Sequence, residues 1–189
     1  INNEKILAIM GGAKMDDKLP LLESLSKKVD GIYIGGGNIN SLMKDKKYRD
    51  YLDSISNNRA KIYSMIDGLC SVDLENTPSY SMVGDIKDNE SFYDIGMQSI
   101  VQLTELIKDY DTIFWNGTLG LVENKLYKHG SISLVNTLMQ SNKKVIIGGG
   151  DTACFVNRFH HNFYYVSTGG GATLDFLSNE ELVGLPFKE

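Results

Sequence analysis

Two lysines and an aspartate stand next to glycine-rich segments, where they could handle phosphate groups. Lys14 directly follows Gly11-Gly12-Ala13, and Lys18 lies four residues further on. The pair Asp151-Thr152 follows a run of three glycines. An ammonium group can neutralise phosphate oxygens, and a carboxylate beside them can hold Mg²⁺, the hard cation that bridges nucleotide phosphates. These residue types in this setting predict a site for phosphoryl chemistry.

Each of these features also has a simpler interpretation. Lys14 and Lys18 could be solvated lysines near a helix start, although cations there oppose the helix dipole and favour a bound anion. Asp151 could be a plain helix cap instead of a metal ligand. A single glycine cluster usually marks only a tight turn. Three separate runs, each at the end of a predicted strand, favour a binding rim; they are Gly35-Gly36-Gly37, Gly148-Gly149-Gly150 and Gly169-Gly170-Gly171.

The elements that must position these residues alternate between short apolar strands and segments with helical spacing. Strands are predicted at residues 5–10, 31–34, 61–66, 111–116, 144–147 and 164–167. Helices are predicted from about residue 17 and over residues 39–46, 95–109 and 131–140. The pattern is typical of βαβ units around a parallel sheet. We therefore predict an α/β fold, a three-layer Rossmann-like domain with a mostly parallel sheet flanked by helices.

The glycine-rich turns all follow predicted strands, so they are expected at one rim of the sheet. Ligands of open parallel sheets bind outside the carboxyl ends of the strands, where backbone N–H groups and helix dipoles attract anions. Neither G-x-x-x-x-G-K-[ST] nor a correctly placed G-x-G-x-x-G is present. The phosphates are therefore not expected in a Walker loop. Residues 70–90 are turn-rich and predict a surface loop, with one short strand near Met82 and Val83.

Charge and composition narrow the class of protein. The 189 residues carry 19 Lys and Arg against 24 Asp and Glu, so the net charge of −5 provides no bulk basic field for nucleic acid. The apolar runs are too short to cross a bilayer, and Ile1 does not begin a secretory signal. Cys70 and Cys154 match no metal or disulfide spacing. We expect one cytoplasmic domain over residues 1–189, without nucleic-acid or membrane partners.

Five segments resemble the phosphoglycerate kinase family, in the order in which that family carries them. They are Gly11-Gly12-Ala13-Lys14-Met15-Asp16-Asp17-Lys18, Ile34-Gly35-Gly36-Gly37, Trp115-Asn116-Gly117-Thr118-Leu119-Gly120-Leu121-Val122-Glu123, Gly148-Gly149-Gly150-Asp151-Thr152 and Ser167-Thr168-Gly169-Gly170-Gly171-Ala172. The resemblance covers Glu4 to about Gly184 and is to the family's C-terminal, nucleotide-binding domain. It implies the glycolytic transfer of a phosphoryl group between 1,3-bisphosphoglycerate and ADP.

The resemblance also implies a role for each matching residue. Lys14 would touch the nucleotide phosphates, and Lys18 would follow the transferred phosphoryl group as the domains close. Asp151 would hold Mg²⁺, with the Thr152 hydroxyl beside it. The expected phosphate contacts and helix-terminus cradle are Asn116, Gly149, Gly150, Gly170 and Gly171, of which the last two join the lysines in the catalytic set. The expected adenine and ribose contacts are Gly36, Gly37, Leu121 and Glu123. The implied ligand is a purine nucleotide, ADP or ATP.

The chain departs from the family pattern at several turns. Thr118 stands where the family has proline after Trp-Asn-Gly, and Met97 stands where a proline follows Asp-x-Gly. The family's Leu-Pro-x-Asp strand end is Ser64-Met65-Ile66-Asp67, and Tyr93 replaces a smaller apolar residue near the base. The stretch over residues 37–61 is shorter than the family's, as though a helix were trimmed. These changes affect the adenine side more than the phosphate chemistry.

Two hypotheses about function follow. The first is the nucleotide half of a phosphoglycerate kinase, whose acceptor domain, which holds 3-phosphoglycerate or 1,3-bisphosphoglycerate, is expected to be absent from residues 1–189. The second is a binding or structural module derived from the kinase and without transfer activity. The joint presence of Lys14, Lys18, Glu123, Asp151 and Thr152 favours the first. The missing acceptor half and the altered turns favour the second.

Overall fold

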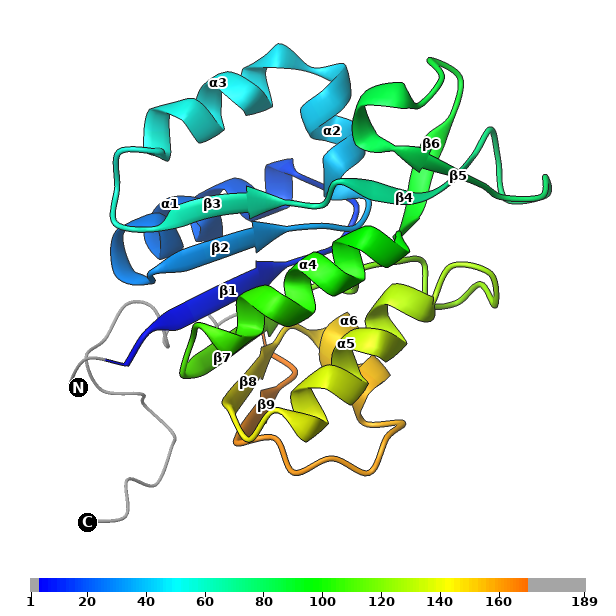
Figure 1. The fold of residues 1–189 in the computed structure, drawn as a ribbon. Coiled ribbons are helices and arrows are strands. Elements are labelled where there is room, and N and C mark those ends of the chain that lie inside the picture. Colours follow the sequence, from blue (N-terminus) through cyan, green and yellow to red (C-terminus); the bar gives the residue numbers. More distant parts are fainter. Residues whose placement is uncertain (1–3, 170–189) are drawn as a thin grey trace, which may run out of the picture.

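The computed structural model describes residues 4–169, which form a six-stranded parallel sheet between two layers of helices (Figure 1). The strand order is β3-β2-β1-β7-β8-β9, and every pair is parallel. These strands are β1 (Ile6–Met10), β2 (Gly31–Ile34), β3 (Lys61–Ser64), β7 (Thr112–Asn116), β8 (Lys144–Gly148) and β9 (Tyr165–Ser167). The predicted fold class is confirmed.

The carboxyl ends of all six strands lie in register, so they form one rim, with Ser64 of β3 paired to Ile34 at one edge. Met10 pairs with Ile34 on one side and with Asn116 on the other, and the row continues through Gly148 to Ser167. The central strands are buried from both faces, and for this reason their sequences are continuous apolar runs without alternation. The predicted gathering of the glycine-rich turns at one rim is therefore correct for the turns within residues 4–169.

The helices cover both faces of the sheet because the chain winds outward from β1 in one direction and from β7 in the other. Right-handed crossovers then place α1 behind the sheet in Figure 1, and α4 and α5 in front of it. The helices are α1 (Leu19–Lys28), α2 (Asn38–Lys44), α3 (Lys46–Ile55), α4 (Met97–Lys108), α5 (His129–Gln140) and α6 (Gly150–Val156). Pro20 lies in the first turn of α1, as expected.

The stretch after β2 differs from the prediction of one helix over residues 39–46. It contains α2, which ends at Lys44, and then α3. Asp45 ends the first helix in an extended conformation and caps the second, because its side chain accepts a hydrogen bond from the Lys47 N–H at 2.9 Å. Only Tyr48 and Ile55 of α3 are buried. This sparse apolar pattern explains why the helix was missed.

Residues 70–90 contain more structure than the predicted surface loop. Three strands form a small antiparallel sheet in the order β5-β4-β6. They are β4 (Asp67–Ser71), β5 (Ser79–Met82) and β6 (Ser91–Ile95). The expected short strand near Met82 is β5, and Val83 instead begins a 3-10 turn that ends at Asp85. Strands β4 and β5 are rich in serine, aspartate and glycine, so their composition is typical of turns.

Helix α4 begins at a carboxylate supplied by another strand. Its N-cap, Gly96, offers no side chain, and the predicted helix start at residue 95 is instead the end of β6. The buried Asp67 of β4 accepts hydrogen bonds from the N–H groups of Gln98 at 3.0 Å and Ser99 at 2.6 Å. Asp67 therefore acts as a remote cap that joins the small sheet to α4.

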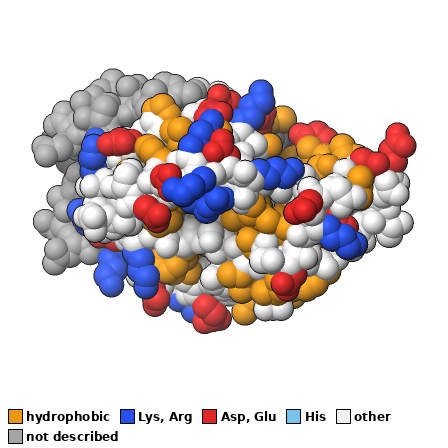
Figure 2. All heavy atoms as spheres, turned by 90° about the horizontal axis from the view of Figure 1, so that it is seen from above, with side chains coloured by type: hydrophobic (Ala, Val, Ile, Leu, Met, Phe, Trp, Pro, Cys, Tyr) orange, Lys and Arg blue, Asp and Glu red, His pale blue; other side chains and the backbone are white. Residues whose placement is uncertain are grey.

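Positive and negative side chains are mixed on the face that carries α3, as Figure 2 shows from above. Lys46 pairs with Asp50, and Lys47 lies 3.6 Å from Asp16. This mixture does not form the single-sign stripe that backbone phosphates of nucleic acid require. Across residues 4–169, none of the helices combines the length and the apolar composition that a membrane span needs.

The cap at Asp67 predicts a specific pH dependence of stability. Burial by itself raises the pKa of Asp67, but hydrogen bonds from Ser99, Tyr80 and the Gln98 N–H outweigh it and hold the pKa below its ordinary value. Because the folded-state pKa is depressed, this stabilisation is present above the ordinary pKa and is lost as the pH falls through the folded-state value. D67N should lower the free energy of unfolding at pH 7 by about 1–3 kcal/mol.

Urea unfolding of the wild type and of D67N at pH 7 and at successively lower pH values tests this expectation. The variant's stability should fall less steeply than that of the wild type below about pH 4. D53N, which changes an exposed aspartate of α3, is the control and should follow the wild type. Equal slopes for D67N and wild type would show that Asp67 does not contribute the pH-dependent stabilisation.

Candidate functional site

The loops after β1 and β7 approach each other more closely than side chains would allow. The Gly11 N–H donates to Asn116 O at 2.9 Å, and the Gly12 N–H donates to Thr118 O at 2.8 Å. Gly117 has a positive φ of 92°, and a Cβ there would lie 2.3 Å from Gly11 O. The contact lies between the strands from which the chain winds in opposite directions, the position at which α/β sheets of this order bind ligands.

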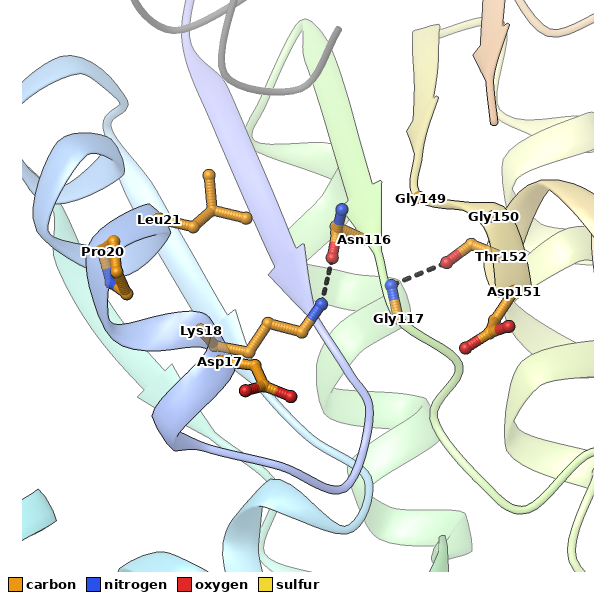
Figure 3. Close-up of a pocket in the computed structure, with 10 residues that line it drawn as sticks. All are labelled: Asp17, Lys18, Pro20, Leu21, Asn116, Gly117, Gly149, Gly150, Asp151 and Thr152. Carbon is orange, nitrogen blue, oxygen red and sulfur yellow. Dashed lines mark hydrogen bonds between the residues drawn. The ribbon is translucent and has the colours of Figure 1, made fainter. Parts of the chain in front are cut away.

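One cavity opens on the β7–β8 side of this contact and has a volume of about 400 Å³ (Figure 3). Its lining residues come from the 3-10 turn before α1 and from α1, β7, α6 and the loops after β7 and β8. Its lining contains Asp17, Lys18, Pro20, Leu21, Asn116, Gly117, Gly149, Gly150, Asp151 and Thr152. We call this the phosphate-side cavity, because it brings together six of the residues predicted to contact phosphates or metal: Lys18, Asn116, Gly149, Gly150, Asp151 and Thr152.

Lys18 is the cation of the phosphate-side cavity. It ends the 3-10 turn Asp16–Lys18, and its Nζ donates a hydrogen bond to Asn116 Oδ1 (Figure 3). Burial lowers the pKa of Lys18, and the negative charges of Asp17 and Asp151 partly offset this shift. The ammonium is therefore partly stripped of water and already oriented, which strengthens its attraction for an incoming anion.

Asp151 and Thr152 lie in the first turn of α6 but differ in exposure. Gly149 is the N-cap of that helix, so the alternative of Asp151 as a plain cap is wrong, and its exposed carboxylate remains available. Thr152 is only 1% exposed, and its Oγ1 accepts a hydrogen bond from the Gly117 N–H at 2.7 Å. The hydroxyl that was expected beside the metal-binding aspartate therefore holds the β7 loop in place.

A second cavity lies on the other side of the loop contact and has a volume of about 510 Å³. Its lining contains Gly12, Ala13, Gly37, Asn40, Leu74, Phe92, Tyr93, Thr118, Gly120, Leu121, Glu123 and Asp151. We call this the base-side cavity, because it contains three of the four residues predicted to contact adenine and ribose: Gly37, Leu121 and Glu123. Asp151 lines both cavities, so the two adjoin at this residue.

The remaining predicted residues lie elsewhere. Lys14 is exposed on the β1 loop and is not among the residues lining either cavity. Gly36 is not in the lining of the base-side cavity either, and a Cβ there would lie 2.9 Å from Thr118 O, so a glycine at this position permits the close approach of the two backbones. Gly170 and Gly171 lie outside the described residues.

Several lining residues carry little sequence signal. Asn40 of α2 lines the base-side cavity, and its side-chain amide makes two hydrogen bonds to the backbone of Phe92. Asn40 Nδ2 donates to Phe92 O at 2.9 Å, and the Phe92 N–H donates to Asn40 Oδ1 at 2.8 Å. Tyr93 was visible only as a departure from the family pattern, and its ring packs against Tyr127 with centroids 5.1 Å apart. The small sheet that carries Phe92 and Tyr93 was not predicted, so their position could not be either.

The donor set fits Mg²⁺ only together with a ligand. Within residues 4–169, no three His, Cys, Asp or Glu side chains converge in a way that could hold a metal ion. Asp151 alone offers an exposed carboxylate at the junction of the two cavities. Mg²⁺ is commonly held by one or two carboxylates plus substrate phosphates and water, so this arrangement suits a cation that arrives with a nucleotide.

The Thr152 hydroxyl generates a prediction about stability. T152V keeps the shape of the side chain but leaves the Gly117 N–H without its acceptor, which should cost about 1–3 kcal/mol of unfolding free energy. T152S retains the oxygen and should recover most of that loss. Chemical denaturation of the three proteins checks this. Similar stability of T152V and wild type would mean that water replaces the hydroxyl.

Comparison with known proteins identifies the family. The model of the family described as phosphoglycerate kinase matches residues 2–180. Phosphoglycerate kinases of Aquifex aeolicus and Mycoplasmoides gallisepticum are each 36% identical, over 94% and 95% of this chain but 49% of their own length. The structure of phosphoglycerate kinase from Coxiella burnetii superposes with a TM-score of 0.83 at 27% identity, covering 96% of this chain and 52% of that one. The chain spans about half the length of these relatives and belongs to the phosphoglycerate kinase family.

Proposed function

We propose that residues 1–189 are the C-terminal, nucleotide-binding half of a phosphoglycerate kinase and bind Mg-ADP and Mg-ATP. The observation that carries the proposal is the pair of cavities at the carboxyl rim that share Asp151 in their lining. One contains the ammonium of Lys18, and the other contains the apolar and aromatic side chains Leu74, Phe92, Tyr93 and Leu121. A nucleotide has the same division between polyphosphate and base. The shared carboxylate of Asp151 then lies where a metal ion would accompany the phosphates.

Each end of the site offers suitable chemistry for its part of the nucleotide. The α6 N-terminus supplies backbone N–H groups and a positive dipole end, and Lys18 supplies a partly desolvated charge. Glu123 is exposed at the base-side cavity, where its carboxylate can accept hydrogen bonds from ribose hydroxyls. Leu121 and the wall at Gly37 provide apolar surface for the base. Lys14, exposed on the adjoining loop, is the proposed second phosphate contact.

Phosphoryl transfer requires little from the protein beyond alignment and charge neutralisation. When bound, Mg²⁺ would neutralise developing charge on the phosphates. Lys18 would stabilise the phosphoryl group as it moves, with Asn116 orienting the ammonium beforehand. The other half of the enzyme would hold 3-phosphoglycerate or 1,3-bisphosphoglycerate in line with the nucleotide. Gly170 and Gly171 belong to the proposed cradle by family resemblance alone.

Calorimetry with Mg-ADP and Mg-ATP tests the binding proposal. D151N should weaken binding about tenfold or more in the presence of Mg²⁺ and reduce the response to added metal, because a charge-assisted contact is lost. E123Q should weaken binding of the nucleotides but not binding of inorganic pyrophosphate, because pyrophosphate lacks ribose. D53N is the control for loss of an exposed carboxylate. An absence of heat and of any thermal shift at millimolar nucleotide would favour the structural-module hypothesis.

A second prediction concerns catalysis. Residues 1–189 alone should show no measurable turnover with 3-phosphoglycerate, because the acceptor would not be aligned with the nucleotide. A family acceptor domain fused ahead of Ile1 should restore activity. In that fusion, K18M should reduce kcat by about a hundredfold or more while changing nucleotide affinity much less, because the charge is needed chiefly in the transition state. K27A, which removes an exposed lysine of α1, is the control.

The coupled kinase assay on the fusion separates the two hypotheses. Turnover by residues 1–189 without an acceptor domain would contradict the two-half account. A folded fusion that binds Mg-ATP and remains inactive would mean that the pocket is retained without the reaction.

A further inference from the structure

The wall of the base-side cavity depends on residues 117–123, which we call the base-side loop. Gly120, Leu121 and Glu123 of this loop line the cavity, yet the loop has no regular strand or helix of its own. Its order must therefore come from contacts with neighbouring elements. The rigidity of the wall that a base or ribose would contact therefore depends on those contacts.

Three of these contacts converge on the end of β6 and the start of α5. The Leu121 N–H donates to Tyr93 O at 2.8 Å, and the Leu119 N–H donates to Ser131 Oγ at 2.9 Å. Gly120 forms an isolated antiparallel bridge with Asp94. Ser131 is buried near the start of α5, so the loop is tied to that helix as well as to β6.

Asp94 lies at the centre of these contacts. Its side chain is buried, Oδ2 accepts from the Gly130 N–H at 3.0 Å, and Oδ1 accepts from the Ile95 N–H at 3.0 Å. A Cβ at Gly120 would lie 2.2 Å from Asp94 Oδ1 and 2.1 Å from Tyr127 O. The loop backbone is therefore pressed against the carboxylate that caps α5.

We propose that Asp94 is a positioning residue for the base and ribose: its buried carboxylate fixes the base-side loop between β6 and the start of α5. The proposal rests on the proposed nucleotide site and adds to it a residue that touches no nucleotide itself. Burying a carboxylate is costly unless hydrogen bonds compensate it, and here the compensation comes from the two elements that the loop must join. Asp94 therefore stabilises this one arrangement of β6, α5 and the loop.

The ionisation of Asp94 determines the conditions of the test. Burial raises its pKa to about 7, against the lowering effect of the hydrogen bonds from the Gly130 and Ile95 N–H groups. At pH 8 the carboxylate is mainly ionised, so neither oxygen carries a proton and both can accept hydrogen bonds from backbone N–H groups. D94N keeps the shape but replaces one acceptor by an NH₂ group, which cannot accept a hydrogen bond.

The chain contains a matched control for this substitution. Asp67 is equally a buried carboxylate that caps a helix from a strand of the small sheet, but its helix is α4 and it does not line the base-side cavity. D67N therefore reproduces the loss of a buried cap without touching the base-side loop. Binding of Mg-ADP and of Mg-pyrophosphate is measured by calorimetry at pH 8 for wild type, D94N and D67N, below their unfolding temperatures.

D94N should raise the Kd for Mg-ADP about three- to tenfold, which is the effect of losing one hydrogen bond that orders the loop. The Kd for Mg-pyrophosphate should stay within about twofold of the wild-type value. D67N should leave both within about twofold. The proposal is overturned if D94N weakens both ligands equally, which indicates general disruption, or weakens neither. If D94N does not fold, S131A serves in its place, because it removes the Ser131 hydroxyl that accepts from the Leu119 N–H of the same loop. S131A should also raise the Kd for Mg-ADP, and an unchanged Kd would count against the proposal.

Hydrogen exchange of the backbone amides separates this proposal from the nucleotide proposal. Without any ligand, amides of residues 117–123 should exchange faster in D94N than in D67N at pH 8, while those of β1 remain equally protected. Equal exchange in the two variants would overturn the positioning role. If wild type binds no Mg-ADP, the proposed function fails, and the exchange result still decides whether Asp94 fixes the loop.

Discussion

The arrangement of the site depends on one close contact between the backbones of the loops that follow β1 and β7. Gly11 and Gly117 approach so closely that a Cβ on either would overlap the other's carbonyl oxygen. The hydrogen bonds to Asn116 O and Thr118 O then fix the loops at the point where the sheet changes its winding direction. Gly117 lines one cavity and Gly12 and Thr118 line the other, so this backbone contact separates the two cavities of the rim.

Buried side-chain oxygens connect this centre to the outer elements. The Thr152 hydroxyl accepts from Gly117 and so couples α6 to the β7 loop. Asp67 caps α4 and Asp94 caps α5, although neither residue belongs to the helix that it caps. A remote cap satisfies orphan N–H groups and at the same time fixes the position of one element against another. The small antiparallel sheet thereby supports the base-side cavity instead of forming a separate unit.

Electrostatics differ between the two ends of the rim. Lys18 is partly desolvated and lies near Asp17, Asp151 and the amide of Asn116, so its charge is held in one orientation before a ligand arrives. Such preorganisation suits a reaction in which charge moves but few protons do. Glu123, in the lining of the base-side cavity, is exposed to solvent. The chain belongs to the phosphoglycerate kinase family and spans about half the length of its relatives.

The parallel sheet and the gathering of glycine-rich turns at its carboxyl rim could be predicted from the sequence, because buried strands and strand-end glycines are local signals. Family resemblance added the residues of the site, and the structure brings most of them to the two cavities. The position of Lys14 outside the lining of both cavities, the loop contact of Thr152 and the capping of distant helices by Asp67 and Asp94 became visible only in the folded chain. The same holds for the small sheet and α3, whose polar sequences lack a strong periodic signal. These features depend on partners far apart in the chain, and spacing along a sequence does not encode which carboxylate will meet which helix.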